Sequence, residues 1–256
     1  ALVHADAHAG RSSADKRGEV ADWLKQQGYE AAVISALDSI AWLLNIRGTD
    51  VDRTPVALSY VIAHADGTAE LFIAPEKVTS ELEQHLGNAV TVRPRDQFEA
   101  GLAALAGKAV AVDPDYCVAA IHHALEAAGA RPVAERDPTI LPKAIKNPVE
   151  QQGQRDAQAR DGAAVARYLH WLSVAAPKGG ETELSAAAKL QEFRLATGLL
   201  KDNSFDTISA AGPHAAIPHY RVDEESNLPI TPGSVFLCDS GGQYEDGTTD
   251  ITRTVW

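Results

Sequence analysis

The sequence predicts two parts, an α/β domain with a mixed sheet followed by an α+β region. Helix and strand patterns alternate through the first half, which is the order that builds layered α/β domains. A basic stretch punctuated by prolines then interrupts the pattern over residues 137–148. Two helical segments followed by a run of strand-like segments occupy the rest, and that order is typical of α+β folds.

The first predicted helix runs from Ser12 to Gly28. Ser12 and Asp15 have the spacing of a capping box, and apolar residues then recur at helical intervals up to the glycine. Residues 31–36 follow as a short apolar run, which we interpret as a buried strand.

A hairpin is expected where Asp66-Gly67 separates two strand-like runs, residues 56–64 and 69–74. Asp-Gly is a strong signal for a two-residue turn, so these strands should be antiparallel neighbours. The rest of this half alternates helices near 76–86, 97–105 and 118–128 with strands near 90–92, 109–112 and 131–134. The hairpin therefore predicts a mixed rather than a purely parallel sheet.

A domain boundary is predicted where Pro138, Pro142 and Pro148 punctuate an extended basic stretch. We place the first domain at 1–145 and the second at 146–256. The second domain should contain helices over about 149–176 and 181–196, then strands near 205–209, 217–220, 235–239 and 249–255.

The composition excludes several classes of protein. The net charge of −12 argues against a nucleic acid partner, which calls for a basic surface. No apolar run of about 18 residues occurs that could span a membrane, and residues 1–17 have no signal-peptide core. Cys117 and Cys238 lie in different segments, as expected for reduced packing thiols in a cytoplasmic protein. Methionine is absent and the chain ends inside a strand-like run, so we expect both ends to be cuts in a longer sequence.

The segment over residues 235–254 carries the clearest chemical pattern. Apolar residues run into Asp239, a glycine-rich turn around Asp246 reverses the chain, and Asp250 follows eleven positions after Asp239 (250 − 239 = 11). A hairpin would bring the two carboxylates side by side, where they repel each other and lose hydration. Such a pair is tolerated if one carboxyl is protonated or if a cation lies between them, and a divalent metal pair meets that need.

Thr252 shares the face of Asp250, because side chains along a strand repeat every two residues. Its hydroxyl would be placed to orient a carboxylate. Asp and Gly are also common in turns, so the alternative is that Asp239 only ends a strand.

Four stretches carry longer and more specific motifs. One is Asp-Ser-Gly-Gly-Gln-Tyr at 239–244 with Asp-Gly-Thr-Thr-Asp-Ile-Thr-Arg-Thr at 246–254. The others are Phe-Asp-Thr-Ile-Ser at 205–209 leading to His-Tyr at 219–220, Lys-Ala-Ile-Lys-Asn-Pro-Val-Glu at 143–150 with Arg-Asp-Gly-Ala-Ala at 160–164 after it, and Asp-Ser-Ile-Ala-Trp-Leu-Leu-Asn-Ile-Arg-Gly at 38–48. Together they resemble the aminopeptidase P family, which belongs to metallopeptidase family M24 in the creatinase/methionine-aminopeptidase superfamily. The resemblance covers almost the whole chain.

The resemblance implies a creatinase-N-like domain followed by the first part of a pita-bread catalytic domain. It also implies a metal-dependent exopeptidase that removes the N-terminal residue from peptides with proline in the second position. Such enzymes hold two divalent ions, commonly manganese with zinc or cobalt as alternatives, by two Asp, one His and two Glu. Asp239 and Asp250 match the two Asp. His219 matches a histidine that lies beside the metals and hydrogen-bonds the reacting peptide group.

The ligating His and both Glu of the family should follow Asp250, and the sequence stops six residues past it (256 − 250 = 6). We therefore expect an incomplete metal site and no activity from this chain alone. For the full-length protein the resemblance implies a peptide substrate and a homodimer. Two departures concern the histidine segment. His214 stands where the family often has Asn, and Pro218 before His219 suggests an edge or bulged strand.

Two other functions stay open. Pita-bread domains also occur as non-catalytic binding modules, although such a module has no reason to keep the pair Asp239 and Asp250. Prolidase- or creatinase-like hydrolysis on a similar scaffold is the second alternative, and the motif at 239–244 favours aminopeptidase P over it. We expect surface or packing roles for the remaining isolated or adjacent histidines, His64, His85, His122, His123 and His170.

Overall fold

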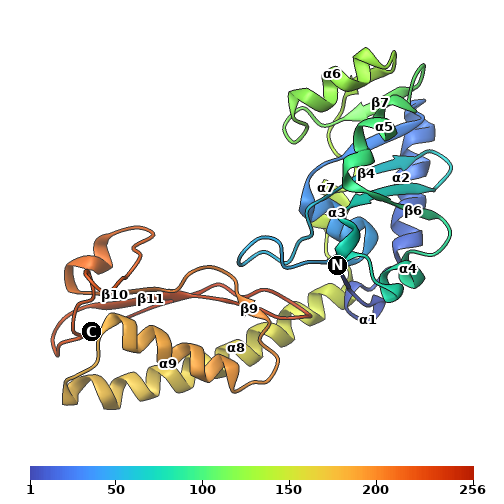
Figure 1. The fold of residues 1–256 in the computed structure, drawn as a ribbon. Coiled ribbons are helices and arrows are strands. Elements are labelled where there is room, and N and C mark those ends of the chain that lie inside the picture. The colour runs from blue at the N-terminus through green and yellow to red at the C-terminus, as the bar shows by residue number, and fades with distance from the viewer. The chain divides into compact units, whose positions relative to one another are not determined.

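The computed structural model describes residues 1–256, and its internal contacts divide the chain into two compact units, Ala1–Val149 and Glu150–Trp256. The sequence placed the boundary slightly earlier, between residues 145 and 146. Each unit has its own hydrophobic core, and the ribbon in Figure 1 shows the helices and strands of each. No helical segment combines the length and the apolar character that a membrane span requires.

A six-stranded sheet in the order β6-β5-β4-β2-β7-β8 forms the centre of the first unit. Its strands are β2 (Ala31–Ile34), β4 (Ser59–His64), β5 (Ala69–Ile73), β6 (Val90–Pro94), β7 (Ala109–Val112) and β8 (Arg131–Ala134). β4 pairs antiparallel with both β2 and β5, whereas the pairs β5–β6, β2–β7 and β7–β8 are parallel. At the hairpin turn the amide of Thr68 donates to Asp66 at 2.9 Å, and Gly67 has a φ of 89°. The prediction of a mixed sheet with this hairpin is confirmed.

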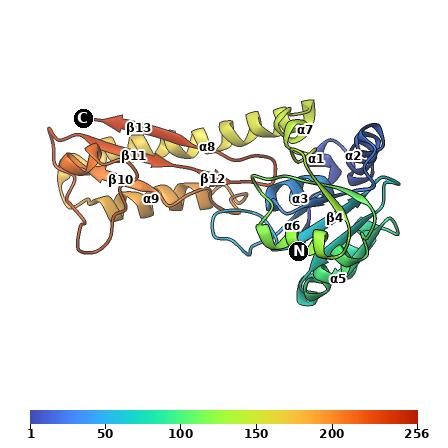
Figure 2. The same cartoon turned by 90° about the horizontal axis from the view of Figure 1, so that it is seen from above.

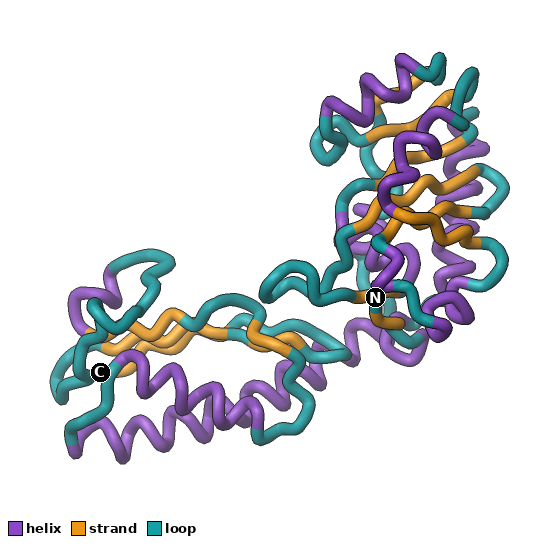
Figure 3. The backbone as a smooth tube through the Cα atoms, viewed as in Figure 1, coloured by secondary structure: helices purple, strands orange, loops and turns teal.

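Helices cover both faces of this sheet (Figure 3). α2 (Ser13–Gln27), α3 (Leu37–Leu44) and α4 (Ser80–Leu86) pack on one core, and α5 (Phe98–Ala103) and α6 (Ala119–Ala127) pack on the other. Val61 belongs to the first core and its neighbour Ile62 to the second, because successive side chains of a strand point to opposite faces. The sheet is therefore buried on both sides.

The predicted start and end of α2 are confirmed. The hydroxyl of Ser12 accepts a hydrogen bond from the amide of Asp15 at 3.1 Å, and Gly28 ends the helix with a φ of 73°. Shorter elements were not predicted: α1 (Asp6–Ala9), β1 (Leu2–Val3), β3 (Ile46–Arg47) and the 3₁₀ turns Pro75–Lys77, Arg95–Gln97 and Ala176–Lys178.

The extended interpretation of residues 137–148 was wrong in its centre, where α7 (Ile140–Ala144) forms. The carboxylate of Asp137 accepts hydrogen bonds from the amide and the hydroxyl of Thr139, at 2.8 and 2.7 Å. This side-chain turn orders the chain into a helical turn despite Pro138 before the helix and Pro142 within it.

The second unit is a three-stranded antiparallel sheet with two helices packed on one face (Figure 2). Its elements are α8 (Pro148–Ala175), α9 (Glu183–Leu195), β10 (Ile208–Ala211), β11 (Phe236–Ser240) and β13 (Ile251–Val255), with β9 (Asp202–Asn203) paired to β12 (Gly242–Gln243). Tyr168 and Leu172 of α8, Leu190 of α9 and Phe236 of β11 belong to one buried core. The α+β prediction for this unit is confirmed.

The strand predicted at 217–220 does not form. A 3₁₀ helix (Gly212–Ala216) follows β10, and a turn then contains His219, whose φ is 56°. Pro218 immediately before it has no amide hydrogen to donate to a strand partner. The left-handed backbone at His219 is equally incompatible with a strand.

Candidate metal centre

Asp239 and Asp250 lie at neighbouring positions where β11 and β13 pair. The register joins Asp239 to Thr252 and Ser240 to Ile251, so Asp250 stands one residue before the start of β13. Asp250 is an exposed residue, but partial loss of hydration raises the pKa of its carboxyl, and the negative charge of Asp239 and a side-chain hydrogen-bonding contact with it raise that pKa further. The hairpin therefore brings the two carboxyl groups together.

One carboxylate oxygen of this pair lacks a hydrogen-bond partner. Oδ1 of Asp239 is buried and has no hydrogen-bond partner within the protein. An unpaired buried carboxylate oxygen costs free energy, and a hard divalent cation is a partner of suitable charge and chemistry. The pair thus fits a metal ion, although no group of three or more His, Cys, Asp or Glu side chains is arranged to hold one.

The two faces of β11 have different characters. Phe236, Cys238 and Ser240 are buried on the side of the helices, whereas Asp239 between them is half-buried on the opposite side. Thr252 is the register partner of Asp239, and its exposed side chain shares the carboxylate face. Alternation along the strand therefore separates the acidic pair from the hydrophobic core.

His219 lies on the turn after the 3₁₀ helix, with an exposed side chain. A left-handed backbone at a residue other than glycine costs on the order of 1 kcal/mol, so the surroundings must hold it. The next residue, Tyr220, is buried, and its hydroxyl donates to Oε2 of Glu183 at 3.0 Å. This anchor fixes the turn that carries His219.

Glu183 is a fully buried carboxylate at the start of α9. It accepts four hydrogen bonds, at distances between 2.7 and 3.0 Å, from the amides of Ala211 and Leu228, from Nδ1 of His214 and from the Tyr220 hydroxyl. The rings of His214 and Tyr220 are also stacked, with centroids 4.3 Å apart. The sequence alone does not single out Glu183, because a Glu directly after a capping threonine is typical of any helix start.

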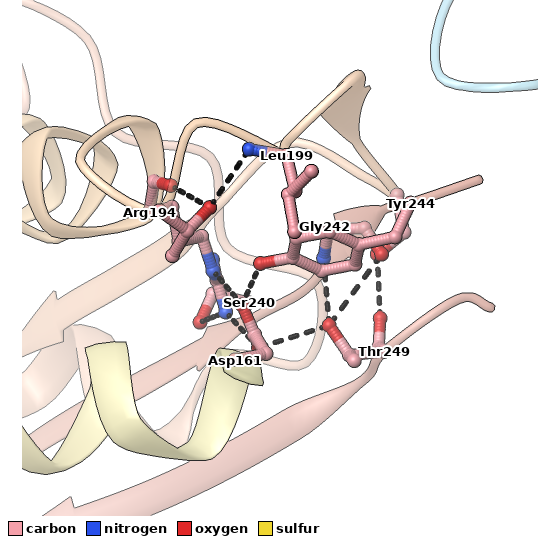
Figure 4. Close-up of polar contacts among 9 residues, drawn as sticks. Asp161, Arg194, Leu199, Ser240, Gly242, Tyr244 and Thr249 are labelled. Carbon is pink, nitrogen blue, oxygen red and sulfur yellow. Dashed lines mark hydrogen bonds and ion pairs between the residues drawn. The ribbon is translucent and has the colours of Figure 1, made fainter. Parts of the chain in front are cut away.

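A second buried charge, Asp161 of α8, forms an ion pair with Arg194 of α9 (Figure 4). Both side chains have 0% exposed surface, and Nε and Nη2 of Arg194 donate to the two carboxylate oxygens at 2.7 and 2.9 Å. The Tyr244 hydroxyl also donates to Oδ1 of Asp161 at 2.7 Å, and the Thr249 hydroxyl donates to Oδ2 at 2.9 Å. Nη2 of Arg194 also donates to the Ser240 hydroxyl at 3.1 Å.

The pKa of Asp161 reflects this environment. Burial works to raise it, but the hydrogen bonds and charge of Arg194, with the hydroxyls of Tyr244 and Thr249, hold it below the usual range. Asp161 is therefore the ionised member of a buried network that satisfies both of its carboxylate oxygens, while Nη1 of Arg194 has no hydrogen-bond partner. The motif at 160–164 contains Asp161, but no local pattern around it predicts its burial or its pairing with Arg194.

The turn of the β11–β13 hairpin also rests on α8. Arg160 binds Asp246 through two hydrogen bonds of 3.0 and 2.8 Å, and the Gln154 side chain donates to the Thr248 carbonyl at 2.7 Å. Gly153 permits this approach, because a Cβ there would lie 2.4 Å from the backbone oxygen of Asp246. The helix holds the hairpin both at its turn and beside the acidic pair.

Comparisons with known families agree with this arrangement. Residues 1–150 match the creatinase/prolidase N-terminal domain, and residues 152–256 match metallopeptidase family M24. Among curated relatives, the chain is 40% identical to the "Probable Xaa-Pro aminopeptidase P" of Aspergillus clavatus over 98% of its own length. It is 37% identical to "Aminopeptidase P2" of Arabidopsis thaliana over 99% of its length. The chain spans about two fifths of each of these relatives, 40% in both cases.

Solved structures give the same picture. The X-prolyl aminopeptidase of Caenorhabditis elegans, described as a cytosolic enzyme with a di-nuclear active site, superposes with a TM-score of 0.91 at 32% identity. The match covers 100% of this chain and 43% of that one. The prolidase of Pyrococcus horikoshii OT3 has a TM-score of 0.72 at 20% identity over 94% of this chain and 64% of its own, a likeness of fold alone.

Proposed function

Because the chain belongs to the creatinase/prolidase N-terminal domain family and its second half to metallopeptidase family M24, we propose that it forms part of an Xaa-Pro aminopeptidase. The reaction would be removal of the N-terminal residue from peptides with proline in the second position. Residues 1–145 would form the creatinase-N-like domain, and residues 146–256 the first part of the pita-bread catalytic domain.

The observation that carries this proposal is the buried, unpartnered oxygen of Asp239 beside a second carboxyl group, that of Asp250. We assign both residues as ligands of two divalent ions, with manganese as the first candidate. Bound metal ions would supply Lewis acidity to the site. Thr252 on the same face would orient the carboxylates.

His219 has a different role in the proposal. Its exposed ring, on a turn anchored by Tyr220, would donate a hydrogen bond to the peptide oxygen that gains negative charge during the reaction. Such a donor stabilises the transition state more than the ground state, so it raises turnover without holding the metal.

The family resemblance assigns five ligands, of which this chain supplies the two aspartates. We therefore propose that the 256-residue chain alone does not catalyse the reaction. In a longer protein that includes the remaining ligands, we propose a cytoplasmic homodimer acting on peptides, with no nucleic acid or membrane partner.

The test of the metal site uses the chain itself. Free Mn²⁺ is followed by electron paramagnetic resonance as it is titrated with the 256-residue chain, with Asp239→Asn and with Asp250→Asn. Either substitution should weaken binding strongly, because each removes one charged ligand of a two-carboxylate site. Glu224→Gln is the matched control, since Glu224 is an exposed acid elsewhere in the same unit.

Mn²⁺ binding by the parent chain that neither aspartate substitution weakens would contradict the assignment of the ligands. Metal-dependent release of an N-terminal residue from an Xaa-Pro peptide by the purified 256-residue chain would contradict the proposal that this chain is inactive alone. A longer protein that binds Mn²⁺ through these aspartates yet cleaves no peptide would instead indicate a non-catalytic binding module.

A further inference from the structure

The buried network around Asp161 contacts the hairpin at two points that flank the acidic pair. Ser240, which follows Asp239, accepts from Arg194, and Thr249, which precedes Asp250, donates to Asp161. Successive residues of a strand face opposite sides, so Ser240 lies on the side of the helices while Asp239 lies on the other face of β11. Thr249 is likewise buried while Asp250 is exposed, and Figure 4 shows the hydroxyls of Ser240 and Thr249 directed at Arg194 and Asp161. The Asp161–Arg194 ion pair thus binds Ser240, next to Asp239, and Thr249, next to Asp250.

We propose that Asp161 and Arg194 are positioning residues that set the spacing of the Asp239 and Asp250 carboxylates through Ser240 and Thr249. The inference rests on the proposed metal site, because the spacing matters only if the two carboxylates share metal ions. Neither Asp161 nor Arg194 touches the metal or the substrate in this scheme.

Stability alone does not account for such a pair. Replacing a buried ion pair by apolar residues of similar volume is often neutral or stabilising, because burying two charges is costly. Here each carboxylate oxygen of Asp161 receives two hydrogen bonds, one of them from the hairpin. The pair is thus well placed to specify geometry, which apolar packing would do less precisely.

The hairpin has little freedom to move at Thr249. Its hydroxyl also accepts from the amide of Gly242 at 2.9 Å, which ties the two arms of the hairpin together. Gly241 brings the arms closer than any other residue could, since a Cβ there would lie 1.9 Å from the Thr249 carbonyl oxygen. A shift of Thr249 would therefore be transmitted directly to Asp250.

The experiment compares Thr249→Val with Thr249→Ser in the 256-residue chain. Valine keeps the volume of threonine and removes the hydroxyl, whereas serine keeps the hydroxyl. Substituting groups that orient metal ligands typically weakens affinity about 10- to 100-fold, so Thr249→Val should raise the Mn²⁺ dissociation constant by that factor and Thr249→Ser by far less. Ser240→Ala removes one neutral hydrogen-bond acceptor of Arg194 and should weaken Mn²⁺ binding less than Thr249→Val does. It replaces the valine variant in the comparison if that variant does not fold.

Asp246→Asn is the matched control. It weakens the Arg160–Asp246 ion pair between the same helix and the same hairpin, but at the turn rather than beside the carboxylates. Stability is measured for every variant by urea unfolding, and affinities are compared only where the protein is folded. If Asp246→Asn weakens Mn²⁺ binding as much as Thr249→Val does, general loosening of the hairpin explains the effect and the positioning role is wrong.

A metal-free measurement separates this proposal from the proposed metal site. Residual dipolar couplings of the amides of Asp239, Ser240, Thr249 and Asp250 report the orientation of these residues in solution. They should change in Thr249→Val and stay close to the parent values in Thr249→Ser. Unchanged couplings in the valine variant would overturn the positioning role, whether or not the chain binds Mn²⁺. Changed couplings, with Mn²⁺ binding by the parent that neither Asp239→Asn nor Asp250→Asn weakens, would overturn only the metal site.

Discussion

The hydroxyl of Tyr220 and the carboxylate of Glu183 are joined by a 3.0 Å hydrogen bond between a surface turn and the buried start of α9. The bond connects the left-handed residue His219 to a carboxylate that also holds the end of β10 through the amide of Ala211. The conformation of this turn is therefore determined by contacts in the interior of the second unit.

Removing the donor, Tyr220, and removing the acceptor, Glu183, should lower the free energy of unfolding by different amounts. Tyr220→Phe removes one hydrogen bond and leaves Glu183 three donors, so the free energy of unfolding should fall by about 1 kcal/mol. Glu183→Ala leaves several buried donors unpaired and should cost about 3 kcal/mol or more. Urea unfolding followed by the NMR amide signals of α9 and β10 measures both, and equal effects would show that Glu183 does not act as a shared acceptor.

His219→Ala should lower kcat strongly in a longer protein that contains the complete metal site. Loss of one donor to a developing oxyanion typically reduces the rate about 10²- to 10³-fold. Metal content, measured by mass spectrometry, should stay at the parent level. An unchanged kcat would remove His219 from the catalytic site, and loss of metal would make it a ligand.

Asp161→Asn should change the pH dependence of stability. The pKa of Asp161 is depressed in the folded protein, so its contribution is present above the unfolded pKa of about 3.9 and is lost as pH falls through the folded value. The urea midpoint of the second unit should therefore decrease less in Asp161→Asn than in the parent as pH is lowered from 5 to 3. At pH 7 the variant should be less stable by about 3–5 kcal/mol, because Arg194 is left without its partner.

A double substitution checks that interpretation of Asp161. Asp161→Leu with Arg194→Met removes both charges together and should be less destabilising than Asp161→Asn alone. If the double variant is destabilised by the sum of its single effects, the two residues do not act as a pair.

Gly153→Ala should destabilise the second unit, although alanine normally stabilises a helix interior by about 1 kcal/mol relative to glycine. The added methyl group would lie 2.4 Å from the backbone oxygen of Asp246 and would displace the hairpin. Gly162 in the same helix has no atom within 4 Å of the equivalent position, so Gly162→Ala should be stabilising. Thermal unfolding of the two variants would contradict this if both shifts had the same sign.

Local sequence patterns predicted the fold where local chemistry decides the structure. The strands β7 and β8 have the predicted bounds, and the ends of the long helix α8 lie within one residue of the prediction. The pairing of Asp239 with Asp250 was predicted because both lie on one hairpin, and the structure brings them together.

The features that the sequence did not predict depend on contacts between distant residues. The turn at His219 depends on Glu183, which lies 37 positions before Tyr220 in the sequence. Asp161 meets Arg194 at a separation of 33 positions, and nothing around either residue indicates burial. Long-range hydrogen bonds of this kind leave no periodic signal, so only the folded structure identifies them.

The buried network around Asp161 also has a consequence for the order in which the second unit can assemble during synthesis. Arg194 is available to Asp161 as soon as α9 has been made, but the remaining donors arrive with Tyr244 and Thr249, 83 and 88 positions after Asp161. Closing such long loops is slow compared with helix formation. A nascent chain would therefore hold a half-satisfied ion pair between its two helices until the hairpin emerges and docks. The acidic pair, which lies on that hairpin, would take shape only after both helices have been made.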